Sequence, residues 1–243
     1  MSSIDFFIVA WSLANVDPRN PLNPDRDRIV VSHGHTSPGV YATLGRLGFF
    51  PIDEAVAHFR QSGSMFEGHV ERSIPGCEWS SGNLGQGLSA AAGMAMASRI
   101  TGRHYHVFAL MSDGEHAKGQ VAEARRFIRK YDLNHVTVLL DLNGLQISGK
   151  TSDIMPVNIK AGILADGWRV IEVDGHDYQA IYQATREAVH DEANPVAILC
   201  HTIMGKGVPA IENNEKWHGA ALPQDLYEEG LNILGIDDDL DRY

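Results

Sequence analysis

Oxygen-bearing side chains follow two apolar segments of the chain, at the point where each segment stops. Asp113 and Gly114 come just after the run "FALM", and Asn143 and Gly144 follow "VTVLLDL". Carboxylate and amide oxygens are hard ligands, and together with carbonyl, water or phosphate oxygens they suit octahedral Mg²⁺. Free N–H groups at the helix start after Gly114 would also favour an anion. The pattern therefore indicates a metal site beside an anion site, which suits the anchoring of a diphosphate.

Each motif alone also has a simpler interpretation, because Asp-Gly and Asn-Gly are common turn sequences. The ligand interpretation depends on the two segments being neighbouring parallel strands. The carboxyl ends of such strands meet at one edge of a sheet, and ligands of these folds lie beyond that edge.

The surrounding segments alternate between strand and helix patterns. Continuously apolar runs predict buried strands at 106–111, 135–141, 168–175 and 195–202. Helical spacing predicts helices at about 85–100, 119–132, 158–167 and 177–191. On the second of these helices, the buried side is predicted to hold Val121, Ala124, Phe127 and Ile128. The alternation predicts an α/β fold, with a parallel sheet covered by helices on both faces.

The first part of the chain has weaker patterns. Phe6, Phe7, Val9 and Ala10 can share one face of an N-terminal helix. A proline-rich segment at 15–28 predicts an ordered loop, because helices do not continue through such a segment. After the loop, "RIVVSHGH" predicts a short strand that ends in a turn.

Composition and charge limit the classes of function. The 243 residues carry 31 acidic and 20 basic side chains, a net charge of −11, which argues against binding to nucleic acid. No apolar run reaches the roughly 18 residues that a membrane-spanning helix needs, and the N-terminus lacks the basic leader of a signal peptide. With only two cysteines, these features predict a cytoplasmic protein without membrane contact. We expect one domain over 1–243 that ends in an acidic, solvated tail at about 232–243.

Several motifs resemble the N-terminal, diphosphate-binding half of transketolase, a thiamine-diphosphate enzyme. "SDG" followed by "DLNG" is similar to the family's thiamine motif, which begins with Gly-Asp-Gly and ends with Asn. "NPDRDRIVVSHGH" and "SSGNLGQGL" resemble two earlier segments, and "VDGHD", "MGKGV" and "WHGAA" follow in the family's order. The resemblance covers nearly the whole chain.

The resemblance implies a cofactor site at the residues identified above. Asp113, the Asn143 side chain and the Leu145 carbonyl would hold Mg²⁺, or Ca²⁺ or Mn²⁺ in its place. Gly114 would approach the diphosphate of thiamine diphosphate through its backbone.

Further cofactor contacts are implied on the aminopyrimidine side. Gly82 and Leu84 would lie against that ring, although a glycine-rich turn alone is a weak signal. Glu123 would belong to a carboxylate network near a subunit interface, and an exposed helical glutamate is an equally good interpretation of it.

Three histidines match family positions near the thiazolium ring, the diphosphate and the bound sugar, namely His35, His69 and His218. Imidazole titrates near neutrality, which suits the transfer of protons to and from a substrate hydroxyl. The chain holds twelve histidines, and His33 competes with His35 for any role of that turn.

The chain departs from the family pattern at several points. Ser112 replaces the first glycine of Gly-Asp-Gly, and Lys118 stands where typical members have a glutamate of the acid network. Trp79 stands where the family usually has small threonines, and a large indole near the aminopyrimidine turn could reshape the pocket. Family members carry a Ser-Gly-His-Pro-Gly segment before the first helix, with a histidine that contacts substrate, whereas this sequence begins inside that helix. Either the segment is missing from this chain or the enzyme lacks that contact, so recognition of ordinary sugar phosphates is open at this point.

The resemblance also implies an architecture. Family members carry their activating glutamate on a second domain and end in a third, and neither is present in this sequence. We therefore expect a split enzyme, active only with a partner subunit that carries the pyrimidine-binding and C-terminal domains, in an α2β2 assembly. It would transfer a two-carbon ketol unit from a ketose or ketose phosphate to an acceptor.

Two alternatives remain at this point. The transferred unit could pass to a thiol on a carrier protein, as in the first components of 2-oxo acid dehydrogenases. The chain could instead be a non-catalytic cofactor-binding subunit or a Mg-nucleotide domain, although it has no Gly-x-Gly-x-x-Gly after a strand and no Gly-Lys-Ser/Thr phosphate loop.

Overall fold

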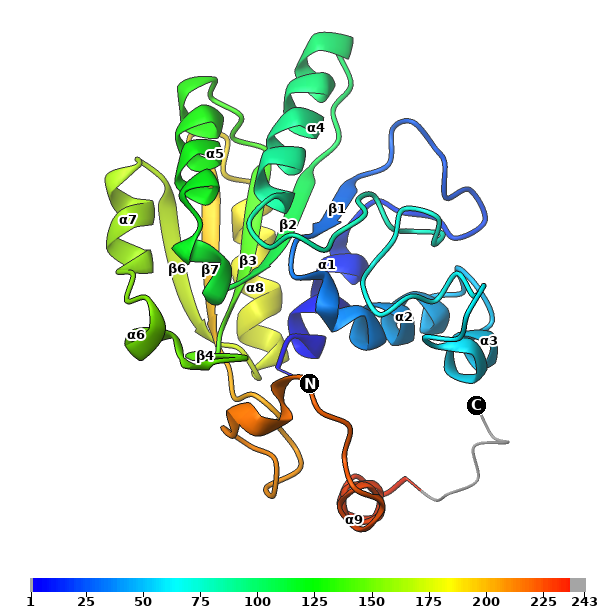
Figure 1. Cartoon of the computed structure of the whole chain (residues 1–243). Coiled ribbons are helices and arrows are strands. Elements are labelled where there is room, and N and C mark those ends of the chain that lie inside the picture. Colours follow the sequence, from blue (N-terminus) through cyan, green and yellow to red (C-terminus); the bar gives the residue numbers. More distant parts are fainter. Residues whose placement is uncertain (1, 237–243) are drawn as a thin grey trace.

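A five-stranded parallel sheet lies at the centre of the computed structural model, which describes residues 2–236 (Figure 1). In spatial order the strands are β1 (Arg28–Val31), β2 (Val107–Ser112), β3 (Val136–Leu142), β7 (Val196–His201) and β6 (Arg169–Asp174). Every neighbouring pair is parallel, and Ser112 of β2 is paired with Asp141 of β3. The predicted parallel sheet is therefore confirmed, and so is the adjacency of the two strands that precede Asp113 and Asn143.

Helices cover both faces of the sheet, because successive strand residues point to opposite sides. Ile29, Phe108 and Leu110 face one layer, and Val30, Val107 and Ala109 face the other. The first layer consists of α1 (Ile4–Leu13), α2 (Ser37–Arg46), α3 (Ile52–His58) and α8 (Tyr178–Val189). The second consists of α4 (Gly87–Thr101), α5 (Gly119–Lys130) and α7 (Ile159–Ala165) (Figure 1).

The predicted buried side of α5 is wrong at one position. Val121, Ala124 and Ile128 are buried, but Phe127 is 41% exposed, with its ring 4.7 Å from that of Tyr131. Arg125 faces inward instead, because its guanidinium pairs with Asp166 at 2.8 Å.

Several short elements have no counterpart in the sequence predictions. They are α2, α3, the hairpin β4 (Leu145–Gln146) and β5 (Gly149–Lys150), α6 (Thr151–Ile154), α9 (Gln224–Ile233) and the 3-10 turn η3 (Glu215–His218). The 3-10 turns η1 (Gly34–Thr36) and η2 (Gly114–Ala117) lie where a turn after β1 and a helix start after β2 were predicted. The proline-rich segment is a loop, as predicted. The predicted acidic tail begins within α9, and its residues 237–243 lie outside the described residues. Within residues 2–236, no helix has both the length and the apolar character to cross a membrane.

Gly87, at the start of α4, allows that helix to lie close to the end of β1. A Cβ at this position would lie 2.4 Å from the Cβ and 2.7 Å from the Cα of Ser32. We expect Gly87→Ala to lower the free energy of unfolding by about 1–3 kcal/mol, measured by urea denaturation. Gly93→Ala in the same helix is the control, because a Cβ there meets nothing within 4 Å. That variant should raise stability by about 0.5–1 kcal/mol, and equal effects of the two changes would contradict the packing argument.

Candidate functional site

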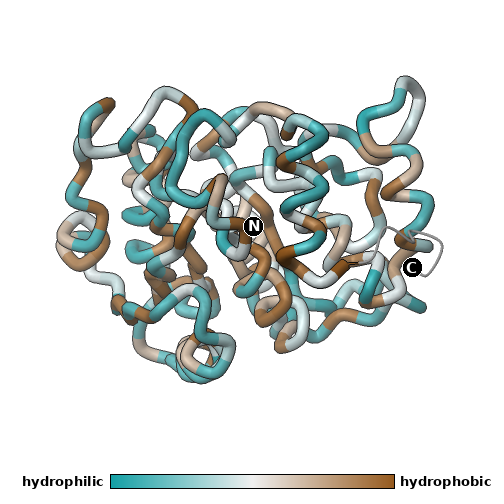
Figure 2. The backbone as a smooth tube through the Cα atoms, turned by 90° about the horizontal axis from the view of Figure 1, so that it is seen from below, coloured by the Kyte–Doolittle hydropathy of each residue, from teal (hydrophilic) through white to brown (hydrophobic). Residues whose placement is uncertain are grey.

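A cavity of about 510 Å³ opens at the carboxyl ends of the central strands. Its walls come from the start of α1, the turn after β1, the ends of β2 and β3, β4 and the segment around η3. In Figure 1 these segments lie together below the sheet, and Figure 2 looks onto this edge, with the N-terminal segment near its centre. Ligands of parallel α/β sheets bind in this kind of crevice, so the cavity is the candidate functional site.

Hydrogen bonds join the two strand ends below the sheet. The Asp113 N–H donates to the Asp141 carbonyl at 3.0 Å, which extends the pairing of β2 and β3 by one step. The Asp113 carboxylate then accepts from Gly144 N–H and from Gly114 N–H, each at 2.7 Å. As predicted from topology, Asp113 and the Asn143–Gly144 turn therefore lie side by side.

Asp113 has the electrostatics of an incomplete cation site. Its side chain is buried, with 6% exposure, and it has no ion pair with a basic side chain within residues 2–236. Burial raises the pKa of Asp113 to about 6, and the nearby Asp141 charge adds to the rise, while the backbone hydrogen bonds oppose it. A carboxylate in this environment would be stabilised by a bound cation.

The donor set of such a site would include amide and carbonyl oxygens. Asn143 Oδ1 accepts from Leu145 N–H at 2.9 Å, and its Nδ2 donates to Asp141 at 3.1 Å. No group of three or more His, Cys, Asp or Glu side chains with metal-binding geometry occurs in the described part of the chain. A site built on Asp113 would therefore be oxygen-rich, which suits Mg²⁺ or Ca²⁺ rather than Zn²⁺.

Sequence reasoning missed Glu115, which anchors the glycine-rich turn. Its fully buried carboxylate accepts from Gly85 N–H at 2.8 Å, from Ser112 N–H at 2.9 Å and from the Ser32 hydroxyl. These bonds tie the ends of β1 and β2 to the turn that contains Leu84. The sequence signal was a carboxylate two positions after Asp113, at the start of a helical turn.

Histidines form one wall of the cavity. The ring centroids of His35 and His218 lie 5.3 Å apart, and those of His33 and His35 lie 6.1 Å apart. Burial, with contributions from the neighbouring His33 and His218, lowers the pKa of His35 to about 3. Burial also lowers the pKa of His218. Both rings are therefore neutral near pH 7 and can accept a proton.

Of the other predicted site residues, some line the cavity and others lie elsewhere on the surface. Leu84 and Gly114 line it, whereas Gly82 is exposed and a Cβ on it would meet no atom within 4 Å. His69 is exposed and lines a separate cavity of about 400 Å³. Glu123 is exposed on α5. The structure therefore brings His35 and His218 together but leaves His69 outside their cavity.

Two departures from the family pattern can be located. Lys118 is exposed, between η2 and α5. Trp79 is partly buried against the core layer of α4 and lines another cavity, with Arg26, Arg28 and Glu78. Trp79 is therefore not part of the wall of the 510 Å³ cavity.

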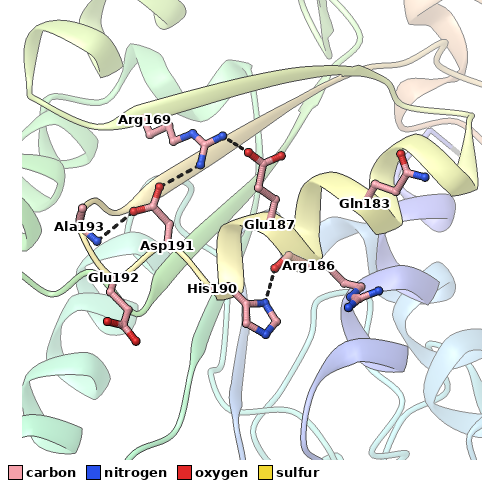
Figure 3. Close-up of a pocket in the computed structure, with 8 residues that line it drawn as sticks. All are labelled: Arg169, Gln183, Arg186, Glu187, His190, Asp191, Glu192 and Ala193. Atoms are coloured by element: carbon pink, nitrogen blue, oxygen red, sulfur yellow. Dashed lines mark hydrogen bonds and ion pairs between the residues drawn. The ribbon is translucent and has the colours of Figure 1, made fainter.

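A larger cavity of about 710 Å³ lies at the opposite edge of the sheet (Figure 3). Its central group is Arg169, which pairs with Glu187 and, at 3.0 Å, with Asp191. Figure 3 shows the guanidinium between these two carboxylates, at the amino end of β6 and the carboxyl end of α8. The charge of Arg169 is compensated by these two carboxylates. The cavity also lies away from the edge of the sheet where ligands of this fold bind, so it is the weaker candidate for the functional site.

The low pKa of His35 predicts a loss of stability in acid. The unfolded side chain has a pKa near 6.5 and the folded one a pKa of about 3, so the unfolded state binds more protons between these pH values. Stability that is present above pH 6.5 is therefore lost as the pH falls. We expect His35→Asn to reduce the loss between pH 6.5 and 5 by about 1–2 kcal/mol in urea unfolding. His69→Asn, at an exposed position, is the control, and equal acid sensitivity of His35→Asn and the wild type would contradict a neutral His35.

Comparisons with known proteins agree with this geometry. A sequence family described as "Transketolase, thiamine diphosphate binding domain" matches residues 1–241. The chain is 36% identical to the "6-deoxy-6-sulfo-D-fructose transketolase subunit SqwG" of Clostridium sp. (strain MSTE9), over 92% of this chain and 82% of that protein. It is 34% identical to one subunit of the apulose-4-phosphate transketolase of Phocaeicola vulgatus, over 91% of this chain and 79% of that protein.

Solved structures show the same fold. The transketolase of Campylobacter jejuni superposes with a TM-score of 0.89 and 30% identity over 96% of this chain. The chain spans 38% of the length of that transketolase.

Proposed function

Since the chain belongs to the family of transketolase thiamine-diphosphate-binding domains, we propose that it is the diphosphate-binding subunit of a two-subunit transketolase-like enzyme. The main support is the match to two relatives named as transketolase subunits, over most of their own length. The other subunit would carry the pyrimidine-binding and C-terminal domains, including the glutamate that activates the cofactor. We propose an α2β2 assembly with the active site between the two kinds of subunit.

A divalent cation fits the residues at the ends of β2 and β3. Asp113 is a buried carboxylate without a cationic partner in the described part of the chain, and it lies beside the Asn143 turn. In our proposal Asp113, Asn143 and the Leu145 carbonyl hold Mg²⁺, for which Ca²⁺ or Mn²⁺ can substitute. The backbone of Gly114 would face the diphosphate, where the start of η2 offers N–H groups to an anion.

The remaining cofactor contacts are proposed from family positions. Leu84, in the cavity wall, would lie against the aminopyrimidine side, together with the exposed Gly82 of the same turn. Gly82 and Glu123 are exposed in this chain. In the proposed assembly, the second subunit would cover both residues.

Histidines of this chain would transfer protons to and from the substrate. When bound, thiamine diphosphate supplies the carbon nucleophile and electron sink for breaking and making the bond next to a ketose carbonyl. His35 and His218 are neutral and close together in the cavity wall, so they would accept protons from substrate hydroxyls or donate hydrogen bonds to substrate oxygens. His69, on the separate surface, would act where that surface meets the bound diphosphate or sugar.

The substrate class we propose is a ketose or ketose phosphate that gives up a two-carbon ketol unit. Two relatives named for different ketoses support this class, and their names favour ketol transfer over transfer of an acyl unit to a carrier-protein thiol.

The direct test of this function is an acceptor assay with the reconstituted complex. The chain is co-expressed with its proposed partner subunit and supplied with thiamine diphosphate, Mg²⁺ and a ketose donor. We expect a two-carbon extension of an aldose acceptor such as ribose 5-phosphate. Transfer only to a lipoylated carrier protein, or no cofactor-dependent transfer to any acceptor, would overturn the proposal.

A further inference from the structure

The ring of His176, in the motif "VDGHD" after β6, has a hydrogen-bond partner at each nitrogen. Nδ1 lies 2.7 Å from a carboxylate oxygen of Asp5, in the first turn of α1. Nε2 lies 2.8 Å from the backbone nitrogen of Ile203, shortly after β7. The side chains of His176 and Asp5 are each 13% exposed, so both hydrogen bonds are largely shielded from water. His176 thus joins two segments that are far apart in the sequence.

The backbone donor fixes the roles of the two ring nitrogens. A backbone N–H can only donate, so Nε2 of His176 accepts from Ile203 and carries no proton. The ring proton is then on Nδ1, which donates it to the Asp5 carboxylate. The position therefore requires one donor and one acceptor on the same side chain. Lysine and arginine, which have only donors, could not make both bonds.

Gly175 allows the turn before His176 to lie directly against the end of β7. Its N–H donates to the His201 carbonyl at 2.8 Å, which continues the pairing of β6 and β7 by one step. A Cβ on Gly175 would lie 2.3 Å from Cγ2 of Thr202 and 3.0 Å from the His201 carbonyl oxygen. This close approach is what brings the His176 ring beside the Ile203 N–H.

The Ile203 N–H is the first residue contact of a loop over 203–213 that forms part of the cavity wall. The ends of the loop are held together, because the Asn213 N–H donates to the Met204 carbonyl at 3.0 Å. Met204 lines the 510 Å³ cavity, and η3, which carries His218, begins two residues after the loop. An anchor at Ile203 therefore acts on the path of the chain toward His218.

We propose that His176 is a positioning residue of the cavity, which joins the start of α1 to the 203–213 loop and so fixes the chain from Met204 to His218. The start of α1 is itself part of the cavity wall, through Ser2, Ser3, Ile4 and Phe7. The bridge thus sets two parts of the wall relative to each other from outside the cavity. Its role in the reaction rests on the proposed function.

Tyr178, the first residue of α8, strengthens the anchor on the α1 side. Burial, together with a hydrogen bond to Asp5 and the negative charge of Asp5, raises the pKa of Tyr178 to about 12. Asp5 therefore accepts from two side chains of the turn between β6 and α8, His176 and Tyr178. The first turn of α1 is held at two points by the same turn that holds the Ile203 N–H.

The first tests use the full chain without any ligand. In ¹⁵N NMR with labelled histidine at pH 7.5, we expect the His176 ring to be protonated at Nδ1 only, and a proton at Nε2 would overturn the proposal. In hydrogen exchange followed by NMR, His176→Ala should raise the exchange rate of the Ile203 amide by about 10-fold, through loss of one hydrogen bond. The amides of β3, in the middle of the sheet, should keep their wild-type rates. An unchanged Ile203 rate would overturn the anchoring role.

The second test measures turnover of the reconstituted complex with a ketose donor and an aldose acceptor. His176→Gln keeps an amide oxygen near the place of Nε2, whereas His176→Asn is one methylene shorter and places its amide near Nδ1. We expect kcat/KM to fall by about 10–100-fold in His176→Asn and clearly less in His176→Gln, because only glutamine can still accept from the Ile203 N–H. The affinity for thiamine diphosphate should stay close to wild type in both variants.

The control for turnover is His190→Gln, at an exposed position after α8, which should keep wild-type kcat/KM. Equal kcat/KM values for His176→Gln and His176→Asn would overturn the positioning role. If the wild-type complex transfers no ketol unit, the proposed function fails and the role of His176 in the reaction fails with it. The NMR and exchange measurements still decide whether His176 holds the 203–213 loop.

Discussion

Asp113→Ala is expected to weaken binding of thiamine diphosphate in the presence of Mg²⁺ by at least about 100-fold. Loss of a residue that only supports a metal ligand typically weakens binding by about 10–100-fold, and loss of the ligand itself should weaken it at least as much. The carboxylate is the single anionic oxygen donor in the proposed site, which otherwise consists of an amide and a backbone carbonyl. Removing it takes away the charge that compensates for dehydrating the cation. Isothermal titration calorimetry of the reconstituted complex measures the affinity directly.

Two further variants separate loss of the ligand from loss of the fold. Asp113→Asn keeps an oxygen that can accept the Gly144 N–H but loses the negative charge, so it should also bind the cofactor weakly while its urea unfolding stays near wild type. Asp153→Ala removes an exposed carboxylate on α6 and should leave the affinity unchanged. Cofactor binding by Asp113→Ala and Asp113→Asn at wild-type strength would rule out the metal site.

His218→Ala is expected to lower kcat/KM by about 10²–10⁴-fold, the usual range for a lost proton-transfer group, while the affinity for thiamine diphosphate stays unchanged. His218 lies on η3, in a segment that reaches the cavity from the far end of the chain, and its ring meets that of His35. In the described part of the chain, the hydrogen bonds of the Asp113 and Asn143 side chains involve neither ring, so the effect should fall on transfer rather than on cofactor binding. Steady-state kinetics with a ketose donor and an aldose acceptor provide the measurement.

The control for this prediction is His190→Ala, in the cavity at the opposite edge of the sheet (Figure 3). That variant should keep wild-type kcat/KM. An unchanged rate in His218→Ala, or an equal loss in both variants, would show that the histidine wall does not act on the substrate.

Much of the fold could be predicted because its strands are locally distinctive. The runs in β2, β3, β6 and β7 alternate with helical patterns, and this alternation predicts a parallel sheet whose carboxyl ends share one edge. The same rule predicts that Asp113 and Asn143 lie close together. By contrast, α2 begins with Ser-Pro-Gly and holds a second glycine, so its helix depends on packing that no local pattern shows.

Long-range polar contacts set the limit of sequence reasoning. The inward turn of Arg125 depends on Asp166, 41 positions away, whereas apolar periodicity pointed to Phe127. The Ser3 hydroxyl donates to the carboxylate of Asp141, 138 positions along the chain. A hydroxyl near the N-terminus carries no local signal of such a partner, because hydrogen bonding of this kind depends on tertiary placement.

The most direct test of the central claim is a calorimetric titration of the wild-type complex with thiamine diphosphate, with Mg²⁺ and again with EDTA. If the oxygens at the ends of β2 and β3 hold a cation that anchors the diphosphate, binding should be saturable with Mg²⁺ and should disappear with EDTA. ATP and NAD should not bind under either condition. Equally tight binding of thiamine diphosphate without a divalent cation, or binding of a nucleotide in its place, would contradict this account.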